Sequence, residues 1–409
     1  MKKFLFLFPI IALVIALSGC DTIGPTEEPT TVPATTTTTA AVTTTAAGTT
    51  TTTAGGTTTT QPSGTTTTTS TSTTTTTIIT GWVPVGSAGF SAGTTGFTSL
   101  AVANGVPYLA YVDGGNGGKV TVMSLEGSSW IPVGAAGLSA GSATYTSLCI
   151  SNGQPFVAYT DATMSGRATV MSLEGSSWIP VGSAGFTAGS ANYLALFIDN
   201  GTPYVTFADG ANSNLATVMK FDGTNWVLVG TAGFSAGAVT NNSLFVYNDR
   251  PYVAYTDGGN SNKVTVMSLE SSSWIPVGSA GFSAGAAYFP SLFISNGVPY
   301  VAFKDTANSF HATVMSLEGS SWTTVGTPGF SSGASAYLSL FIYNDTPYIG
   351  YMNQDLSNKA TVERFNGTSW ILVGTAGFSA GQASNTSLFI ENGVPYIAFR
   401  TATAAMKPL

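Results

Sequence analysis

From residue 78 to residue 400, short apolar runs alternate with clusters of turn residues. The runs at 291–295, 299–303, 312–317 and 322–326 illustrate the pattern, since they are rich in β-branched, aromatic and small residues. Many runs are apolar or small on both faces, which suits a sheet packed between two neighbouring sheets. Helical periodicity is absent. The pattern therefore predicts an all-β domain with four strands in each such stretch.

The seven tryptophans define the period of this pattern. Each follows the previous one by 48 residues, without an insertion or deletion: Trp82, Trp130, Trp178, Trp226, Trp274, Trp322 and Trp370. Every copy also carries Asn-Gly or Asn-Asp at one fixed place, and Asn-Gly is typical of a two-residue hairpin turn. A β-solenoid coil is usually shorter and lacks such a turn, whereas about 40–50 residues with four antiparallel strands make one propeller blade. We therefore predict a seven-bladed β-propeller with the tryptophans as wedges between blades.

The two ends of the repeat region are incomplete in a complementary way, with strands lettered A to D from the propeller axis outward. Residues 81–86 match a D strand, and residues 386–400 match only an A strand and a B strand. Residues 72–79 fall where the C strand is missing, and threonine is a good strand former. We expect strands from both termini to close the seventh blade, which would remove exposed sheet edges.

The copies resemble kelch and Asp-box propeller repeats in length and hairpin layout, over Ile78 to Arg400. They are most similar to bacterial surface repeats that read approximately GxPYVAYxD…KATVMxxxGxxW…VG. The resemblance implies a propeller fold and says little about function. The Asp-box itself is not matched, because the segment from Ser124 to Trp130 has Glu126 in place of Asp and is one residue short.

The first residues have the pattern of a secretion signal. Lys2 and Lys3 precede an apolar stretch at 4–17, which is shorter than the ~20 residues that cross a bilayer. The segment ends in Leu-Ser-Gly-Cys at Cys20 and resembles the lipobox of bacterial lipoproteins, in which the cysteine is lipidated and becomes the mature N-terminus. An ordinary signal peptide followed by a chance cysteine is the alternative. We expect a signal peptide at 1–19 and membrane attachment through Cys20.

The chain has one other cysteine, Cys149. If Cys20 carries lipid, no intrachain disulfide is expected in the mature chain. Cys149 occupies the repeat position of Phe197 and Phe245, so we expect a core residue rather than a nucleophile.

Residues 20–71 are mostly threonine, with alanine, glycine and scattered proline. Such a segment cannot bury enough apolar surface to offset its ordering entropy, so we expect a disordered linker. Thr-rich tracts with proline resemble O-glycosylated stalks. We interpret the segment as a spacer between a membrane anchor and a propeller domain at 72–409; unselected low complexity is the alternative.

Charge narrows the range of partners. A net charge of −7 and a pI near 4.6 argue against nucleic acid, which requires a basic surface. They also argue against electrostatic attachment to an anionic membrane. The expected partners are the membrane, through lipid on Cys20, and a surface glycan or a protein. We expect an exported monomer anchored in the cell envelope, and the choice between inner and outer membrane is left open.

Candidate ligand-binding residues emerge when the seven copies are compared. One position just before strand A varies while the strands hardly change: Phe97, Tyr145, Tyr193, Asn241, Phe289, Tyr337 and Asn385. The B-to-C loops vary as well and should share the same rim of the propeller. Aromatic faces beside small polar groups suit sugar rings or peptides. The five aromatic members are therefore the candidate ligand-binding residues; the alternative is that they plug gaps between blades.

A row of aspartates ends strand B at one register: Asp113, Asp161, Asp209, Asp257 and Asp305. The segment 257–262 is rich in oxygen atoms that suit Ca²⁺, but its spacing does not match an EF-hand loop. Capping of a turn is the commoner role of such residues. We predict no metal site and no cofactor.

The few reactive side chains disfavour an enzyme. His311 is the only histidine, so a Ser-His or Cys-His unit has no support beyond one residue. A sialidase would need an arginine cluster, whereas the four arginines map to different levels of the blade: Arg167, Arg250, Arg364 and Arg400. One Asp per repeat gives a ring rather than the carboxylate pair of a glycosidase. We predict no catalytic residues and a binding or adhesion module, with a surface glycan as the first ligand. A structural or protein-binding envelope scaffold is the alternative, followed by a glycan-processing enzyme.

Overall fold

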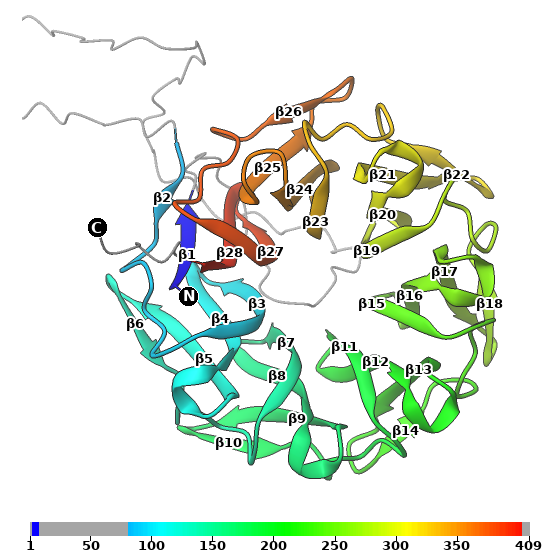
Figure 1. The fold of residues 1–409 in the computed structure, drawn as a ribbon. Helices are drawn as coiled ribbons and strands as arrows, with labels where there is room; N and C mark the ends of the chain where they lie inside the picture. The colour runs from blue at the N-terminus through cyan, green and yellow to red at the C-terminus, as the bar shows by residue number, and fades with distance from the viewer. Residues whose placement is uncertain (1, 8–80, 403–409) are drawn as a thin grey trace, which may run out of the picture. The chain divides into compact units, whose positions relative to one another are not determined.

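The computed structural model describes residues 2–7 and 81–402. These residues form four-stranded antiparallel sheets joined by turns and short 3-10 helices. In Figure 1 the sheets are arranged radially, with β3, β7, β11, β15, β19, β23 and β27 innermost. The prediction of an all-β propeller with four-stranded antiparallel blades is therefore confirmed. No helix in these two ranges has the length and apolar composition needed to cross a membrane.

Six blades are each built from four consecutive strands, in the order A to D. Blade 1 contains β3 (Thr95–Ala103), β4 (Val106–Asp113), β5 (Lys119–Glu126) and β6 (Ser129–Pro132); blade 2 contains β7 (Ala143–Ser151), β8 (Gln154–Asp161), β9 (Arg167–Glu174) and β10 (Ser177–Pro180). Blade 3 contains β11 (Ala191–Asp199), β12 (Thr202–Asp209), β13 (Leu215–Phe221) and β14 (Trp226–Leu228); blade 4 contains β15 (Val239–Tyr247), β16 (Arg250–Asp257), β17 (Lys263–Glu270) and β18 (Ser273–Pro276). Blade 5 contains β19 (Ala287–Ser295), β20 (Val298–Asp305), β21 (His311–Glu318) and β22 (Ser321–Thr324); blade 6 contains β23 (Ser335–Tyr343), β24 (Thr346–Asn353), β25 (Lys359–Phe365) and β26 (Trp370–Leu372).

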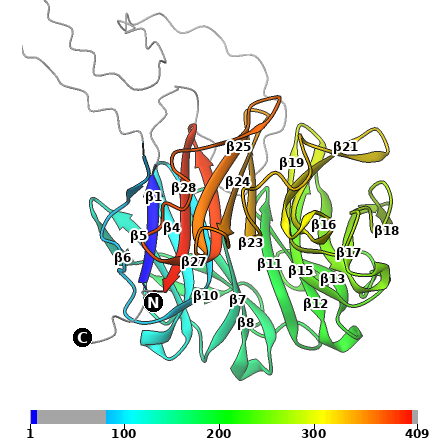
Figure 2. The same cartoon turned by 45° about the horizontal axis from the view of Figure 1, so that its top comes forward.

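A further sheet, here called the composite sheet, combines the two ends of the chain. From the axis outward it contains β27 (Gln382–Glu391), β28 (Val394–Ala402), β1 (Lys2–Leu7) and β2 (Val83–Pro84). Figure 2 shows β1 beside β28.

The composite sheet corrects part of the prediction. The sequence predicted seven blades with residues 72–79 as the last C strand, whereas the structure has six blades of consecutive strands and places Lys2–Leu7 in that C position. The rest of the predicted signal peptide, the Thr-rich segment at 20–71 and residues 72–79 lie outside the described residues.

Each blade buries both of its faces. Val157 and Ala158 are consecutive in β8, so their side chains point to opposite faces of the sheet, and both are fully buried. One apolar cluster combines Val120 and Val122 of blade 1 with Leu148 and Ile150 of blade 2. The core therefore lies between neighbouring blades, as expected from runs that are apolar on both faces.

The A–B hairpins form as the Asn-Gly and Asn-Asp dipeptides predict. Asn104 and Gly105 join β3 to β4 with φ angles of 53° and 77°. Asn248 and Asp249 join β15 to β16 with φ angles of 51° and 58°. Two consecutive left-handed residues are what a type I′ turn requires, and its twist matches that of the flanking strands.

The tryptophans join neighbouring blades, which confirms their predicted role as wedges. Nε1 of Trp226 in blade 3 donates to the carbonyl of Val181, which follows blade 2, at 2.8 Å, and the indole stacks on Phe186 with ring centroids 4.1 Å apart. The same hydrogen bond across 45 residues recurs at Trp130, Trp178, Trp274, Trp322 and Trp370.

Cys149 lies in β7 and packs with Phe156 and Leu196 at 2% exposure, which confirms its expected place in the core. The expectation of a mature chain without an intrachain disulfide depends on lipidation of Cys20, which no described residue tests, so it stays a prediction. Cys20, the predicted lipidation site, lies outside the described residues.

Candidate binding site on the propeller axis

The seven varying positions identified from the sequence meet in one pocket of about 230 Å³, here called the axial pocket. Each A strand contributes one of them: Phe97, Tyr145, Tyr193, Asn241, Phe289, Tyr337 and Asn385. Because the innermost strands of all the sheets in Figure 1 take part, the pocket lies on the propeller axis. The sequence placed these residues in the loop before strand A, and that placement is wrong. They lie within the strand, and the structure brings all seven together.

A β-bulge in each A strand positions these side chains. In β11, Tyr193 and Leu194 together oppose the single residue Phe207, because the register shifts between Asn192 and Ala195. Tyr193 has a φ of 52°, and the six equivalent residues have φ angles between 48° and 54°. Asparagine tolerates this left-handed conformation, but a bulky aromatic residue in it is strained by about 1–3 kcal/mol. Backbone strain of this kind tends to occur at functional sites.

The aromatic side chains contact one another around the axis, and Tyr145, Tyr193 and Phe289 also pack against the apolar clusters between blades. Phe97 and Tyr145 have ring centroids 5.0 Å apart, and Tyr145 and Tyr193 have centroids 5.1 Å apart. Phe289 and Tyr337 form a second arc with centroids 5.1 Å apart. Asn241 and Asn385 occupy the positions between the two arcs, and all seven side chains are half-buried. The pocket wall thus consists of two arcs of aromatic faces separated by primary amides.

Hydrogen bonds between neighbouring bulges hold this ring in place. The hydroxyl of Thr146 donates to the carbonyl of Phe97 in the preceding blade, and Thr98 and Thr386 donate to the equivalent carbonyls of Asn385 and Tyr337. The position of Thr146 is taken in β15 by Asn242, which also lines the pocket. Its side-chain amide nitrogen and oxygen are both buried and have no hydrogen-bond partner among the described residues. A buried amide without a partner is unfavourable, so a ligand that paired with it would gain affinity.

The chemistry of the axial pocket suits binding. Burial, with a smaller contribution from Tyr193, raises the pKa of Tyr145, so its hydroxyl stays protonated at neutral pH and can both donate and accept. Among the described residues that line the pocket there is no carboxylate, histidine, lysine or cysteine. The wall therefore offers aromatic faces, phenol hydroxyls and amides.

The aspartates that end strand B are used within their own turns. Asp209 accepts hydrogen bonds from the backbone nitrogen of Ala211 at 3.0 Å, from Nδ2 of Asn212 at 2.8 Å and from Oγ1 of Thr217 at 3.1 Å. These bonds cap the 3-10 helix η3 (Gly210–Asn212), and the pattern recurs at Asp113, Asp257 and Asp305. The aspartates thus have the turn-capping role that the sequence favoured.

A second cavity, of about 530 Å³, lies between blades 5 and 6 and contains none of the predicted site residues. A sequence signal for it exists, because Arg364 stands where four other copies have serine and Asp345 stands where five have glycine. Asp345 belongs to an A–B hairpin and Arg364 lies near a C–D hairpin, at the end of the blade opposite the B-to-C loops. The prediction considered only the loops at that other end, and so it missed this cavity.

No protein-family model matches the chain, and comparison with curated proteins finds no relative. Solved structures with partial similarity include the SapL1 lectin in complex with α-methyl fucoside, at 16% identity over 71% of this chain and 98% of that chain, with a TM-score of 0.47. The six-bladed β-propeller lectin of Aleuria aurantia has 16% identity over 69% of this chain and 96% of that chain, with a TM-score of 0.46. YjhT has 13% identity over 69% of this chain and 98% of that chain, with a TM-score of 0.46. Similarities this low define neither the family nor the ligand of this chain.

Proposed function

We propose that this chain is a binding module that holds a small polar ligand at the axial pocket, with a glycan unit as the first candidate. The proposal is carried by the five aromatic side chains in left-handed backbone conformations around one pocket. Asn241 and Asn385 occupy two of the equivalent positions, so the fold itself does not need an aromatic residue there. Strained aromatic residues at the other five positions are therefore better explained by contact with a ligand than by stability.

The composition of the pocket supports a sugar ring over other ligands. Aromatic faces stack on the apolar face of a sugar, and amides and phenol hydroxyls pair with its hydroxyl groups. The volume of about 230 Å³ matches one ring or one side chain of a partner. Because a partner side chain has a similar size, an envelope scaffold that binds protein is the second candidate.

The test uses substitutions that the fold already accepts. Tyr145→Asn and Tyr193→Asn place asparagine in a backbone conformation that Asn241 and Asn385 adopt, so the melting temperature should stay nearly unchanged. Binding of the full chain to a glycan array should weaken by about threefold to tenfold for each variant, because a stacked aromatic is lost. Tyr288→Asn is the matched control, since Tyr288 is exposed and lies outside the pocket.

Two results would contradict the proposal. Unchanged glycan affinity in both asparagine variants would remove the axial pocket as the site. A wild-type chain that binds no glycan and instead recovers a protein would favour the scaffold.

We further propose that the chain is exported and anchored by lipid on Cys20, with residues 20–71 as a spacer. The support is the sequence pattern of a short basic start, a short apolar core and a terminal cysteine. Removal of residues 1–19 would vacate the C position that Lys2–Leu7 occupies beside β28. Residues 72–79 precede β2 in the chain and are the proposed replacement, which would complete a seventh blade from both ends of the mature chain.

A further inference from the structure

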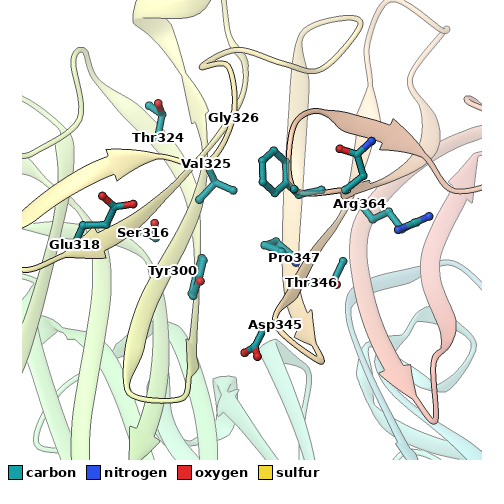
Figure 3. A pocket seen from close by; sticks show the side chains of 13 residues that line it. Tyr300, Ser316, Glu318, Thr324, Val325, Gly326, Asp345, Thr346, Pro347 and Arg364 are labelled. Atoms are coloured by element: carbon teal, nitrogen blue, oxygen red, sulfur yellow. The ribbon is translucent and has the colours of Figure 1, made fainter. Parts of the chain in front are cut away.

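The groove between blades 5 and 6 differs in chemistry from the axial pocket. Figure 3 shows Tyr300 and Glu318 on blade 5, across the gap from Asp345, Thr346 and Arg364 on blade 6. The groove has a volume of about 530 Å³, more than twice that of the axial pocket. Both walls come from rigid strands and tight hairpins, so the shape is already formed.

Three residues that depart from the commonest residue of the repeat line this groove. Arg364 replaces a serine found at the equivalent position of four copies, Asp345 replaces a glycine found in five, and Thr324 replaces a proline found in four. All three residues line the groove. The chain otherwise repeats its strands with little change, so three departures around one cavity point to a local role rather than to the fold.

The charges of the groove are not neutralised by one another. In blade 4, Arg250 forms an ion pair with Glu270 of the same blade. In blade 6, Asn366 takes the position of that glutamate, and no ion pair of Arg364 occurs among the described residues. Figure 3 shows the guanidinium group of Arg364 turned away from Glu318. The carboxylate across the gap is therefore left available to a ligand.

The polar groups of the groove offer both donors and acceptors. Burial, followed by the negative charges of Asp345 and Glu318, raises the pKa of Tyr300, so its hydroxyl remains a donor at neutral pH. Asp345 is held in place because its Oδ1 accepts from Oγ of Ser295 at 3.1 Å and from Nδ2 of Asn296 at 2.7 Å. Its Oδ2 has no hydrogen bond within the described part of the chain and can accept one from a ligand.

We propose that this groove is a second binding site, independent of the axial pocket, for a neutral polyhydroxylated ligand of about one or two sugar rings. Two carboxylates disfavour an anion, and the positive charge of Arg364, which lines the same groove, disfavours a cation. A hydroxyl group both donates and accepts, so vicinal hydroxyls can pair with Glu318 and Asp345 while accepting from Arg364 or Thr346. The rings of Tyr300 and Phe365, which also lines the groove, provide apolar surface for the other face of the sugar.

The experiment titrates the full chain with four free methyl glycosides, of mannose, galactose, fucose and N-acetylglucosamine, by ligand-observed NMR and calorimetry. Arg364→Ser and Asp345→Gly restore the residue of the other copies, so both variants should melt as the wild type does. Each should weaken binding of the best glycoside by about tenfold or more, since a charge-assisted hydrogen bond is lost. Glu318→Gln should do the same, whereas Glu174→Gln at the equivalent position of blade 2 is the matched control and should leave binding unchanged.

The two sites can be told apart in this experiment. Tyr193→Asn changes the axial pocket and should leave binding at the groove intact. If the axial pocket binds no ligand, the test of the groove is therefore unaffected. The proposal is overturned if none of the four glycosides binds at millimolar concentration, or if Glu318→Gln and Glu174→Gln give the same affinity.

Discussion

Nε1 of Trp82 donates a hydrogen bond to the carbonyl oxygen of Val373, at 2.7 Å, across 291 residues of sequence. The indole also stacks on Phe378 with ring centroids 4.6 Å apart. This pair repeats the contact that joins the other blades, but here it connects the start of the described domain to its last third. The ring is therefore closed by the same bond that holds each pair of consecutive blades.

Loss of this bond should destabilise the whole domain. Trp82→Phe keeps an aromatic ring on Phe378 and removes the donor to Val373, so the free energy of unfolding should fall by about 1 kcal/mol. Trp226→Phe removes the same bond at an internal junction and should have a similar effect. Chemical denaturation of both variants checks the prediction. A Trp82→Phe protein as stable as the wild type, beside a weakened Trp226→Phe protein, would mean that the ring is open at this junction in solution.

The fold was readable from the sequence because its signals are local and periodic. The spacing of Trp130 and Trp178 gives the size of a blade, and Asn104-Gly105 marks a turn that only a few residue types can form. Adjacent apolar residues such as Val157 and Ala158 show that both faces of a blade are covered. None of these inferences needs knowledge of which blades are neighbours.

The site was only partly readable because it depends on backbone geometry and on contacts between copies. Tyr193 was selected correctly as a varying position, but tyrosine gives no sequence signal for a left-handed conformation, so the bulge was missed. Asparagine at two equivalent positions was the available hint. The groove between blades 5 and 6 was missed because Glu318 and Asp345 come from different copies, and only the ring brings them together.

One junction between neighbouring A strands lacks a hydrogen bond that the other junctions have, and a substitution that adds this bond should stabilise the protein. Oγ of Ser147 accepts from the backbone nitrogen of Leu196 in the next blade at 3.0 Å, and the same bond occurs at five other junctions. Between blades 3 and 4 the equivalent residue is Ala195, opposite Leu244. Ala195→Ser should therefore raise the free energy of unfolding by about 0.5–1.5 kcal/mol, and Ser147→Ala should lower it by a similar amount. Opposite shifts in the denaturation midpoints are the expected readout, and a destabilised Ala195→Ser protein would contradict the idea that the junctions are equivalent.

Cys20→Ser tests the proposed anchor. Lipoproteins carry more than one acyl chain, which gives stable attachment, so the variant should leave the membrane fraction and appear in the soluble fraction. Its melting temperature should match that of the wild type if the anchor makes no contribution to folding. Fractionation of cells that express each form checks this, and a variant that remains in the membrane pellet would rule out lipidation at Cys20 as the means of attachment.

Blade 6 carries a buried carboxylate where five other copies have methionine. Glu363 lies in β25 at 6% exposure and accepts a hydrogen bond from the hydroxyl of Tyr351 at 2.5 Å. Burial raises the pKa of Glu363, and the hydrogen bond from Tyr351 opposes part of that effect. The folded state therefore favours the protonated carboxyl group more than the unfolded state does.

This buried acid makes stability depend on pH in a defined direction. Below pH 4.5, the ordinary pKa of Glu363 and its value in the unfolded chain, the carboxyl group is neutral in both states. Folding then buries no charge, and the contribution of this group to the free energy of unfolding is fully present. As the pH rises through the raised folded pKa, the folded state must bury a charge, so stability falls and then stays low. Glu363→Gln keeps the shape and an acceptor for Tyr351 but cannot ionise. The melting temperature of this variant should therefore exceed that of the wild type increasingly as the pH rises from 4.5 towards neutrality.

Tyr351→Phe, which matches the phenylalanine at 207, 303 and 399, removes the opposing hydrogen bond and should move the decline of stability to higher pH. If the difference in melting temperature between Glu363→Gln and wild type is the same at every pH, the pKa of Glu363 does not differ between the folded and unfolded states.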